Sequence, residues 1–187
     1  MKIHIENLCK SYGGSPVLKN VSFTAGPGVT CIMAPSGSGK TTLLRILLGL
    51  ERPDSGTVGL PEKCRWSAVF QEDRLLEGLD AMGNLRFVLG SALDEAAALA
   101  LLAELGLEDA VGKPAREFSG GMKRRLALAR ALLAPFDVLA LDEPFTGLDQ
   151  DNRERAWRCV REHAAGKPVL LVSHELPPEG AYDLVRL

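Results

Sequence analysis

The sequence predicts an α/β fold with a mainly parallel sheet, an N-terminal antiparallel β portion and a helical insertion. Short apolar runs at 29–33, 138–141 and 169–172 have the length and composition of buried strands, and each ends in small or polar residues. Segments with helical apolar spacing follow at 41–48 and around 153–163. Because parallel strands present their C-terminal ends at one edge of a sheet, we expect the functional site along that edge.

The N-terminal portion is expected to form antiparallel strands. Alternation begins at Ile3, a second strand is expected at 17–23, and Gly13 to Pro16 between them has the composition of a turn. The middle of the chain, from 73 to 117, is rich in helix-forming residues, and a further helix is expected after Ser119. The insertion is therefore placed at about 73–135.

The whole chain has the size and composition of one domain, 1–187. Its 187 residues are 46% hydrophobic and 25% charged, as in ordinary globular proteins, and its net charge of −2 predicts no nucleic-acid partner. The first residues alternate and carry early charges, unlike a signal peptide, and no apolar run reaches the ~18 residues that cross a bilayer. We expect a cytoplasmic protein. The four cysteines are scattered without CxxC spacing, so no metal or disulfide role is expected.

The loop after the run at 29–33 has the spacing of a Walker A motif, with Ala34 in the place of the first glycine. Gly37 and Gly39 let several amides point at one phosphate, and the following helix presents its N-terminus to the anion. Lys40 can reach the β- and γ-phosphates, and the Thr41 hydroxyl can ligate Mg²⁺. The strand before the loop and the helix after it favour a P-loop NTPase core over a simple Gly/Ser turn. The nucleotide-binding residues expected here are Ser36, Gly37, Ser38, Gly39, Lys40, Thr41 and Thr42. If residue 34 needed a positive φ, alanine would cost about 1–2 kcal/mol there.

Two carboxylates, Asp142 and Glu143, follow the run at 138–141. An Asp-Glu-Pro triplet after a strand is often only the start of a helix, but beside a P-loop it is the expected Walker B motif. Asp142 would then hold Mg²⁺, and Glu143 would act as general base toward the attacking water.

The segment Phe118-Ser119-Gly120-Gly121-Met122, followed by a basic helix, resembles the signature motif of ABC ATPases, with Phe for the usual Leu and Met for the usual Gln. Other motifs follow in that family's order: Tyr12 as the aromatic residue stacked on adenine, Gln71 in the Q-loop, Asp149 in the D-loop and His174 as the switch histidine. Ser119 is also a good N-cap, and the two glycines leave the helix amides uncovered. Nearly the whole chain therefore resembles the nucleotide-binding subunit of an ABC transporter.

This resemblance implies ATP and Mg²⁺ as cofactors and ATP hydrolysis that powers import of a small solute. It implies catalytic roles for Glu143, His174 and Gln71, and metal contacts from Thr41, Gln71 and Asp142. Ser119, Gly120, Gly121 and Asp149 would act across a homodimer, or a pair of ABC subunits, with ATP at the interface. Further implied partners are membrane-spanning permease subunits and a separate substrate-binding protein. The chain would lie on the inner face of the cell membrane.

The stretch 69–76 and the signature resemble importers of nitrate, sulfonate or taurine most. In these, the surface at about 73–86 receives a helix of the permease. Leu75, Leu76, Leu79 and Met82 line that groove or form the insertion's own core, and both alternatives stay open. The cluster Lys123-Arg124-Arg125 is expected to be a solvated helix face.

Three other functions compete with this one. A soluble ABC ATPase of DNA repair or translation would carry a coiled coil or duplicated domains, and a P-loop metabolite kinase would not need the signature or His174. A binding-only subunit is supported by Ala34 alone, since the catalytic residues are intact.

Overall fold

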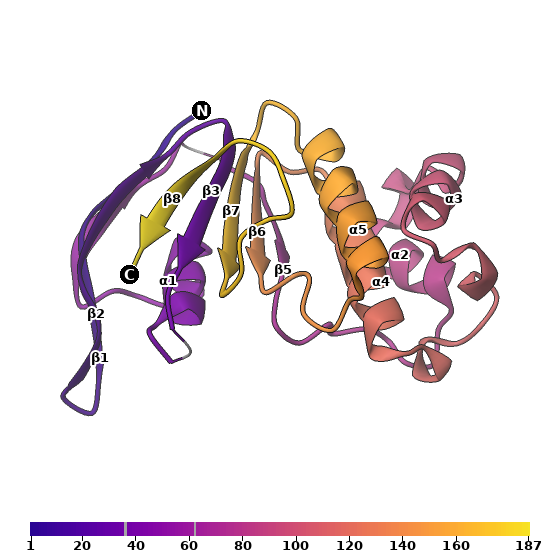
Figure 1. The fold of residues 1–187 in the computed structure, drawn as a ribbon, viewed down its shortest axis with the longest axis horizontal. Coiled ribbons are helices and arrows are strands. Elements are labelled where there is room, and N and C mark those ends of the chain that lie inside the picture. The colour runs from indigo at the N-terminus through magenta and orange to yellow at the C-terminus, as the bar shows by residue number, and fades with distance from the viewer. Residues whose placement is uncertain (36, 62) are drawn as a thin grey trace. The chain divides into compact units, whose positions relative to one another are not determined.

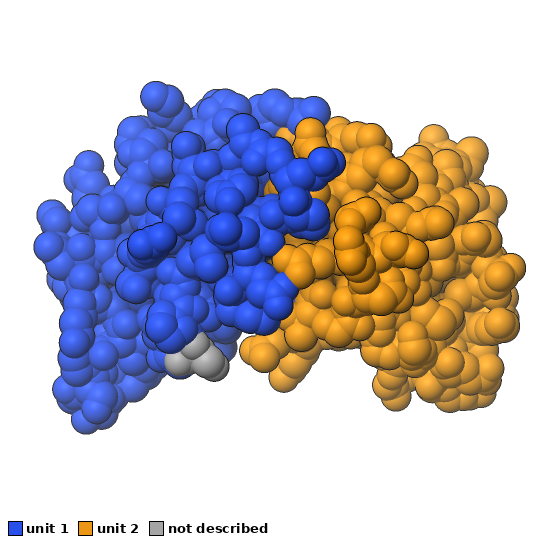
Figure 2. Space-filling view, in the orientation of Figure 1, with its two compact units in different colours: residues 1–68, 136–143, 165–187 blue, residues 69–135, 144–164 orange. Residues whose placement is uncertain are grey.

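A computed structural model describes residues 1–35, 37–61 and 63–187. The chain divides into two compact units, which Figure 2 shows in different colours. Unit 1 consists of residues 1–68, 136–143 and 165–187, and unit 2 consists of residues 69–135 and 144–164. The expected insertion at about 73–135 falls within the first segment of unit 2. The single domain over 1–187 stays a prediction.

Unit 1 contains the expected antiparallel portion, a three-stranded sheet in the order β2-β1-β4. The strands are β1 (Ile3–Tyr12), β2 (Ser15–Ala25) and β4 (Ser55–Gly59). A tight turn joins β1 to β2, because Gly13 and Gly14 both have positive φ, 56° and 81°. On β1 the buried Ile3 and Ile5 alternate with exposed residues, so one face of this sheet packs on the core.

The second sheet has five strands in the order β5-β6-β7-β3-β8 (Figure 1). Its members are β3 (Gly28–Met33), β5 (Trp66–Val69), β6 (Val138–Asp142), β7 (Pro168–Ser173) and β8 (Tyr182–Arg186). Strand β3 pairs in parallel with both β7 and β8, and β6 pairs in parallel with β7. Every residue of β6 and β7 is buried, as in strands covered on both faces. The predicted fold class is thereby confirmed for the central sheet.

Helix α1 (Lys40–Leu47) belongs to the core of unit 1. Its buried Leu43, Leu44 and Leu47 belong to one apolar cluster that also holds Ile3 and Ile5 of β1 and residues of β3, β6 and β7. This packing fixes the start of α1 against the sheet, and the start of α1 follows directly from the loop after β3.

Unit 2 is helical. It contains α2 (Ala81–Leu89), α3 (Glu95–Glu104), α4 (Gly120–Leu133), α5 (Gln150–His163) and short 3₁₀ turns at Gly90–Ala92, Glu108–Ala110 and Ala115–Glu117. Each of the four α-helices begins at a side chain that accepts a hydrogen bond from a backbone N–H of its first turn; these N-caps are Asp80, Asp94, Ser119 and Asp149. In the described parts of the chain, no helix combines the length and the apolar character needed to cross a membrane.

Candidate functional site

Among the described residues of the loop between β3 and α1, no side chain caps the start of the helix. The N-cap of α1 is Gly39, with φ 91°, and it makes no side-chain cap hydrogen bond. A Cβ atom at Gly39 would lie 2.7 Å from the Cγ1 atom of Val17, so both the backbone angle and the space require glycine. Gly37 also has a positive φ, 78°, but with open space around it. An uncapped helix start after a glycine loop is a binding site for an anion.

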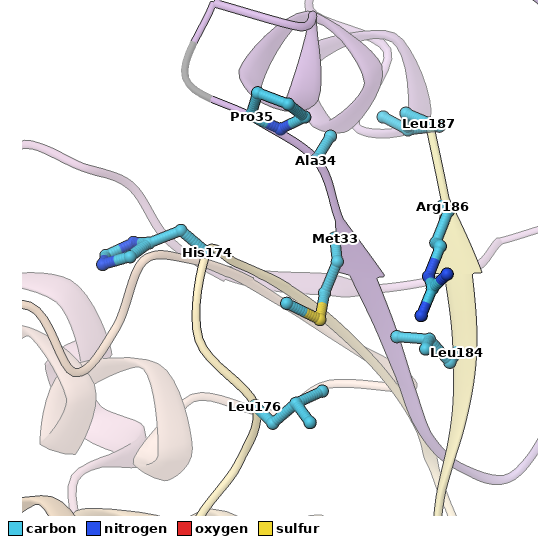
Figure 3. Close-up of a pocket in the computed structure, with 8 residues that line it drawn as sticks. All are labelled: Met33, Ala34, Pro35, His174, Leu176, Leu184, Arg186 and Leu187. Atoms are coloured by element: carbon cyan, nitrogen blue, oxygen red, sulfur yellow. The ribbon is translucent and has the colours of Figure 1, made fainter.

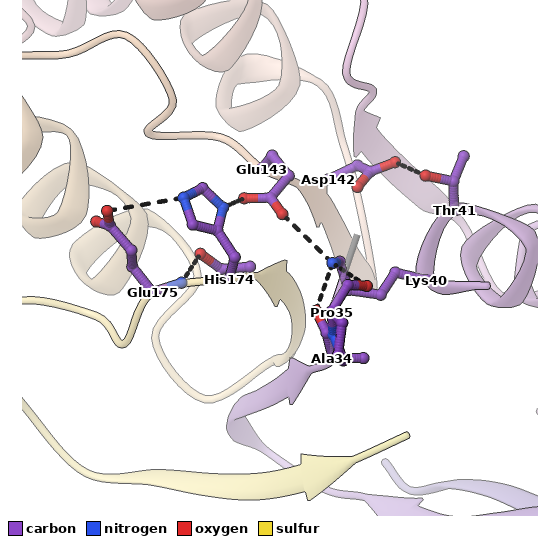
Figure 4. Close-up of polar contacts among 9 residues, drawn as sticks. Ala34, Pro35, Lys40, Thr41, Asp142, Glu143, His174 and Glu175 are labelled. Atoms are coloured by element: carbon purple, nitrogen blue, oxygen red, sulfur yellow. Dashed lines mark hydrogen bonds and ion pairs between the residues drawn. The ribbon is translucent and has the colours of Figure 1, made fainter. Parts of the chain in front are cut away.

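Lys40, the first residue of α1, is buried, and backbone carbonyls of the preceding loop hold its ammonium group. Its Nζ atom donates to the carbonyl oxygens of Ala34, at 2.6 Å, and Pro35, at 3.2 Å, and lies 3.8 Å from Oε1 of Glu143 (Figure 4). A buried ammonium group needs such acceptors. Ala34 is absent from the described non-glycine residues with positive φ, so alanine costs no left-handed strain at this place of the Walker A motif.

Thr41 and Asp142 bring a hydroxyl and a carboxylate together. The Thr41 Oγ1 atom, in the first turn of α1, donates a hydrogen bond of 2.8 Å to Oδ2 of Asp142, the last residue of β6. Asp142 is only 2% exposed. Two hard oxygen donors beside an anion-binding loop form the kind of donor set that holds Mg²⁺ together with phosphate oxygens. The Ser38 hydroxyl also supports a ligand here, because its Oγ atom is buried and has no hydrogen-bond partner among the described residues.

Glu143 lies between a cation and an imidazole at the ends of two neighbouring strands. Its Oε2 atom is 2.8 Å from Nδ1 of His174, which follows β7, and the Nε2 atom of His174 lies 3.7 Å from a carboxylate oxygen of Glu175 (Figure 4). The backbone of Glu143 has φ 50° and donates its N–H to the carbonyl of Val172 at 2.9 Å. A non-glycine residue in this region is strained, and such strain concentrates at functional sites.

Three other residues of unit 1 were predicted to bind nucleotide: Tyr12, Thr42 and Ser36. Tyr12 lies at the end of β1 with 48% of its surface exposed; its hydroxyl donates to the Glu51 carboxylate, and the Lys10 ammonium lies 5.4 Å from its ring centroid. An exposed ring fixed at its tip can stack on a flat ligand. Thr42 is half-buried in α1. Ser36 lies outside the described residues.

In unit 2, the signature and the D-loop lie side by side. Ser119 accepts a hydrogen bond of 3.2 Å from the N–H of Met122 and so caps α4, and Gly120 is exposed at the helix start. A Cβ atom at Gly121 would lie 3.4 Å from the carbonyl oxygen of Gly147 in the D-loop. Asp149 caps α5 through a 2.9 Å bond from the Asn152 N–H, and hydrogen bonds from Asn152 hold the pKa of the Asp149 carboxyl below its usual value.

The prediction of a solvated face at Lys123-Arg124-Arg125 is wrong for the two arginines. Arg124 is 4% exposed and Arg125 is 8% exposed. Arg125 donates to the carbonyls of Leu105, at 2.6 Å, and Gly106, at 2.9 Å, so it ties α4 to the end of α3. These two carbonyls follow the end of α3 and have no helical N–H partner, and the Arg125 guanidinium supplies the missing donors. These hydrogen bonds explain why the Arg125 side chain is buried. Lys123 is 26% exposed at its side chain and pairs with a surface carboxylate, as a solvated residue would.

Arg124 and Arg130 of α4 hold the segment that carries Gln71. Arg124 donates to the carbonyls of Phe70 and Gln71 and to Oδ1 of Asp73, the last at 3.0 Å. Arg130 donates to the carbonyls of Asp73, at 2.8 Å, and of the residue after it. The Gln71 side chain is exposed while its backbone is fixed to the signature helix. Sequence reasoning missed this clamp, although the basic residues after the signature were visible.

The four apolar residues at 75–82 divide between the two alternatives left open above. Leu76 is 40% exposed and Leu79 is 38% exposed, whereas Met82 is 9% exposed and belongs to the buried core. Leu75 is half-buried. The surface alternative therefore keeps Leu76 and Leu79 but not Met82.

Comparison with known proteins decides the family. The family described as "ABC transporter" matches residues 18–146, more than half of the chain. This chain belongs to the ABC transporter family. The predicted family is thereby confirmed.

Relatives and a solved structure agree with this assignment. The chain is 41% identical over 182 residues to the aliphatic sulfonates import ATP-binding protein SsuB 1 of Agrobacterium fabrum, covering 91% of this chain and 64% of the relative. It is 39% identical over 189 residues to the Nod factor export ATP-binding protein I of Paraburkholderia xenovorans, covering 92% and 62%. The chain thus spans somewhat less than two thirds of these relatives. A solved structure of an "ATP binding subunit of ABC transporter" superposes with a TM-score of 0.81 at 25% identity, covering 94% of this chain and 80% of that one. The predicted fold class is confirmed.

Proposed function

We propose that this chain binds and hydrolyses ATP with Mg²⁺ and that this powers the import of a small solute, as the nucleotide-binding subunit of an ABC transporter. One observation carries the proposal, namely the cluster of polar contacts at the strand ends of unit 1. Thr41 contacts Asp142 at 2.8 Å. Glu143 contacts Lys40 at 3.8 Å and His174 at 2.8 Å. These are the groups that phosphoryl transfer requires, namely phosphate binding, metal binding and a base.

The residues present fit both a triphosphate and a magnesium ion. The uncapped amides at the start of α1 and the unpartnered Ser38 hydroxyl would bind phosphate oxygens. Thr41 and Asp142 would hold Mg²⁺, with Gln71 as a further contact. When bound, Mg²⁺ would neutralise the negative charge that develops on the phosphate oxygens. Tyr12 would stack on the adenine ring.

The protein's own groups then perform the hydrolysis. Lys40 exchanges its carbonyl acceptors for the β- and γ-phosphate oxygens. Glu143 accepts a proton from the water whose oxygen attacks the γ-phosphorus, and the bond from that phosphorus to the bridging oxygen breaks, which leaves ADP and phosphate. His174 holds the Glu143 carboxylate through Nδ1 and would contact the γ-phosphate. Gln71 would contact the metal and the attacking water.

The signature in unit 2 supports a partner chain. Ser119 caps α4, but Gly120 and Gly121 place no side chain over this helix start and Gly120 is exposed, so the start of α4 is a second surface for phosphate. We propose that it binds the γ-phosphate held by a second copy, or by a paired ABC subunit, so that two ATP molecules lie in a head-to-tail dimer. Asp149 would act across that interface.

The names of the relatives support membrane partners. One relative is named as an import ATP-binding protein and another as an export ATP-binding protein. We propose that permease subunits bind this chain at the inner face of the cell membrane, with exposed Leu76 and Leu79 in the contact, and that a separate substrate-binding protein delivers the solute. No nucleic-acid partner is proposed.

Two aspartates at opposite ends of β6 provide a matched test of the metal site. Asp142 is the last residue of the strand, whereas Asp137 precedes it and pairs with Arg65 at 2.9 Å. Asp142→Asn should weaken Mg²⁺-dependent binding of a fluorescent ATP analogue by about 10- to 100-fold, the loss of one charged contact. Asp137→Asn should leave that affinity unchanged. If both variants keep the magnesium dependence of the natural chain, Asp142 holds no metal and the proposed site is wrong.

A further inference from the structure

A pocket of about 490 Å³ lies in unit 1, beside the ends of β3 and β8 and the segment that follows β7 (Figure 3). Such a volume is typical of small-molecule sites. Its walls are mainly apolar, with Met33, Pro35, Leu176 and Leu184, and its two basic side chains are His174 and Arg186. The proposed catalytic site uses His174 and, through their carbonyls, Ala34 and Pro35. The other residues that line this pocket have no role in catalysis as proposed above.

The two basic side chains of the pocket, His174 and Arg186, lie on opposite sides of it, with Met33 between them and Leu184 beside Arg186 (Figure 3). In the parallel register of β3 and β8, Met33 pairs with Arg186, and Leu184 lies two residues earlier on the same face. Figure 3 shows Leu176 across the pocket from Leu184. Leu176 is 45% exposed and Leu184 is 42% exposed, so both keep apolar surface in water that a ligand would cover.

Charge selects the kind of ligand. Within the described part of the chain, the Arg186 guanidinium makes no hydrogen bond and no ion pair. Asp183, the nearest acidic residue on β8, lies at an odd number of residues from Arg186 and so points to the other face of the sheet. Glu175 is directed to Nε2 of His174 at 3.7 Å. An unpaired guanidinium at the rim of an apolar pocket fits a carboxylate, which it can bind through two hydrogen bonds.

We propose that this pocket binds a small aliphatic carboxylate, with the head group on Arg186 and the chain against Leu176 and Leu184. The pocket also touches the functional site, because His174 lines it and contacts Glu143, and because Pro35, whose carbonyl accepts a hydrogen bond from Lys40, lines it as well. A bound carboxylate therefore slows ATP hydrolysis. That regulatory effect rests on the proposed function, whereas the binding site does not.

Octanoate is the probe, measured by isothermal titration calorimetry without nucleotide. The natural chain should bind octanoate, and Arg186→Gln should bind octanoate at least about tenfold more weakly. The natural chain should also bind neutral octanamide at least about tenfold more weakly than octanoate. Arg52→Gln, which removes an exposed arginine elsewhere in unit 1, is the control and should bind octanoate normally. Equal octanoate affinity in the natural chain and Arg186→Gln, or no binding up to about 10 mM, overturns the site.

Two further measurements separate the remaining outcomes. Phosphate release by the natural chain should fall at least threefold at saturating octanoate, an effect of about 0.7 kcal/mol, and Arg186→Gln should resist it. If octanoate binds but hydrolysis is unchanged, the regulatory effect is overturned while the site stands; if the chain binds octanoate but never hydrolyses ATP, it is the proposed function that fails. Sedimentation velocity without nucleotide tests whether a second copy of this chain occupies the pocket instead. If the natural chain is a dimer and Leu184→Gln is a monomer, a second copy fills the pocket and the proposal is overturned.

Discussion

The clamp that Arg124 forms on the Gln71 segment predicts a large stability difference between two arginine variants of unit 2. Arg124→Met keeps most of the side-chain length but removes the donors to two carbonyls and to Asp73. The side chains of this ion pair are 5% and 24% exposed. Removing one partner of a buried pair costs about 3–5 kcal/mol, and the partial exposure of Asp73 places the expected loss near 3 kcal/mol. In a chain of this length that lowers Tm by about 6–12 °C.

Arg86→Met is the matched control. Arg86 pairs with Glu95 at 2.5 Å, but their side chains are 57% and 62% exposed, so this pair contributes less than about 1 kcal/mol. Thermal and urea unfolding, followed by circular dichroism, should show the larger shift for Arg124→Met alone. Hydrogen exchange at the amides of 70–74 should also accelerate in that variant. Equal shifts in the two variants would refute the argument that burial of Arg124 fixes this segment.

Three further predictions concern unit 1. Gly39→Ala should lower the free energy of unfolding by about 3 kcal/mol, because the new Cβ atom would lie 2.7 Å from the Val17 side chain at a residue whose φ is 91°. Gly37→Ala has open space around it and should lower the free energy of unfolding by about 1 kcal/mol. Equal losses for the two variants in urea unfolding would contradict this prediction. Hydrogen bonds from the Arg65 side chain and backbone hold the pKa of Asp137 below its usual value of 3.8, so Asp137 stabilises the fold above that pH and loses the contribution as pH falls below it. The urea midpoint of the natural chain should therefore fall more between pH 5 and pH 3 than that of Asp137→Asn, and parallel pH profiles would count against the ion pair. The Asp142→Asn variant should bind a fluorescent ATP analogue about 10- to 100-fold more weakly in the presence of Mg²⁺, whereas Asp137→Asn should not.

Much of the fold was readable from the sequence because its central strands are continuous apolar runs. The strands expected at 29–33, 138–141 and 169–172 lie within β3, β6 and β7, and each is bounded by residues that stop a strand. Strand β4 was not predicted, because Ser55–Gly59 is short and mostly exposed and owes its pairing to β1 rather than to its own composition. Strand β8 was missed for the same reason, since tertiary pairing with β3 determines it.

The candidate site was predictable where motif spacing alone fixes position. The loop at Lys40 and the carboxylates at Asp142 and Glu143 come from segments far apart in sequence, yet each was recognisable by its place after a strand. The burial of Arg124 was not predictable, because a basic residue on a helix is usually solvated and only the carbonyls that α4 meets in unit 2 reverse that preference. The contact of His174 with Glu143 likewise depends on how β6 and β7 pair, which no local pattern reports.

The most direct test of the proposed function is phosphate release and ATP-dependent dimerisation of the natural chain and Glu143→Gln, measured together. Loss of a general base should slow phosphate release by about 10²- to 10⁴-fold, while Lys40, Thr41 and Asp142 still bind the nucleotide. ATP should therefore convert Glu143→Gln into a stable dimer by light scattering after size-exclusion chromatography. A Glu143→Gln protein that releases phosphate at the natural rate, or that binds ATP and stays monomeric, would contradict the proposed mechanism.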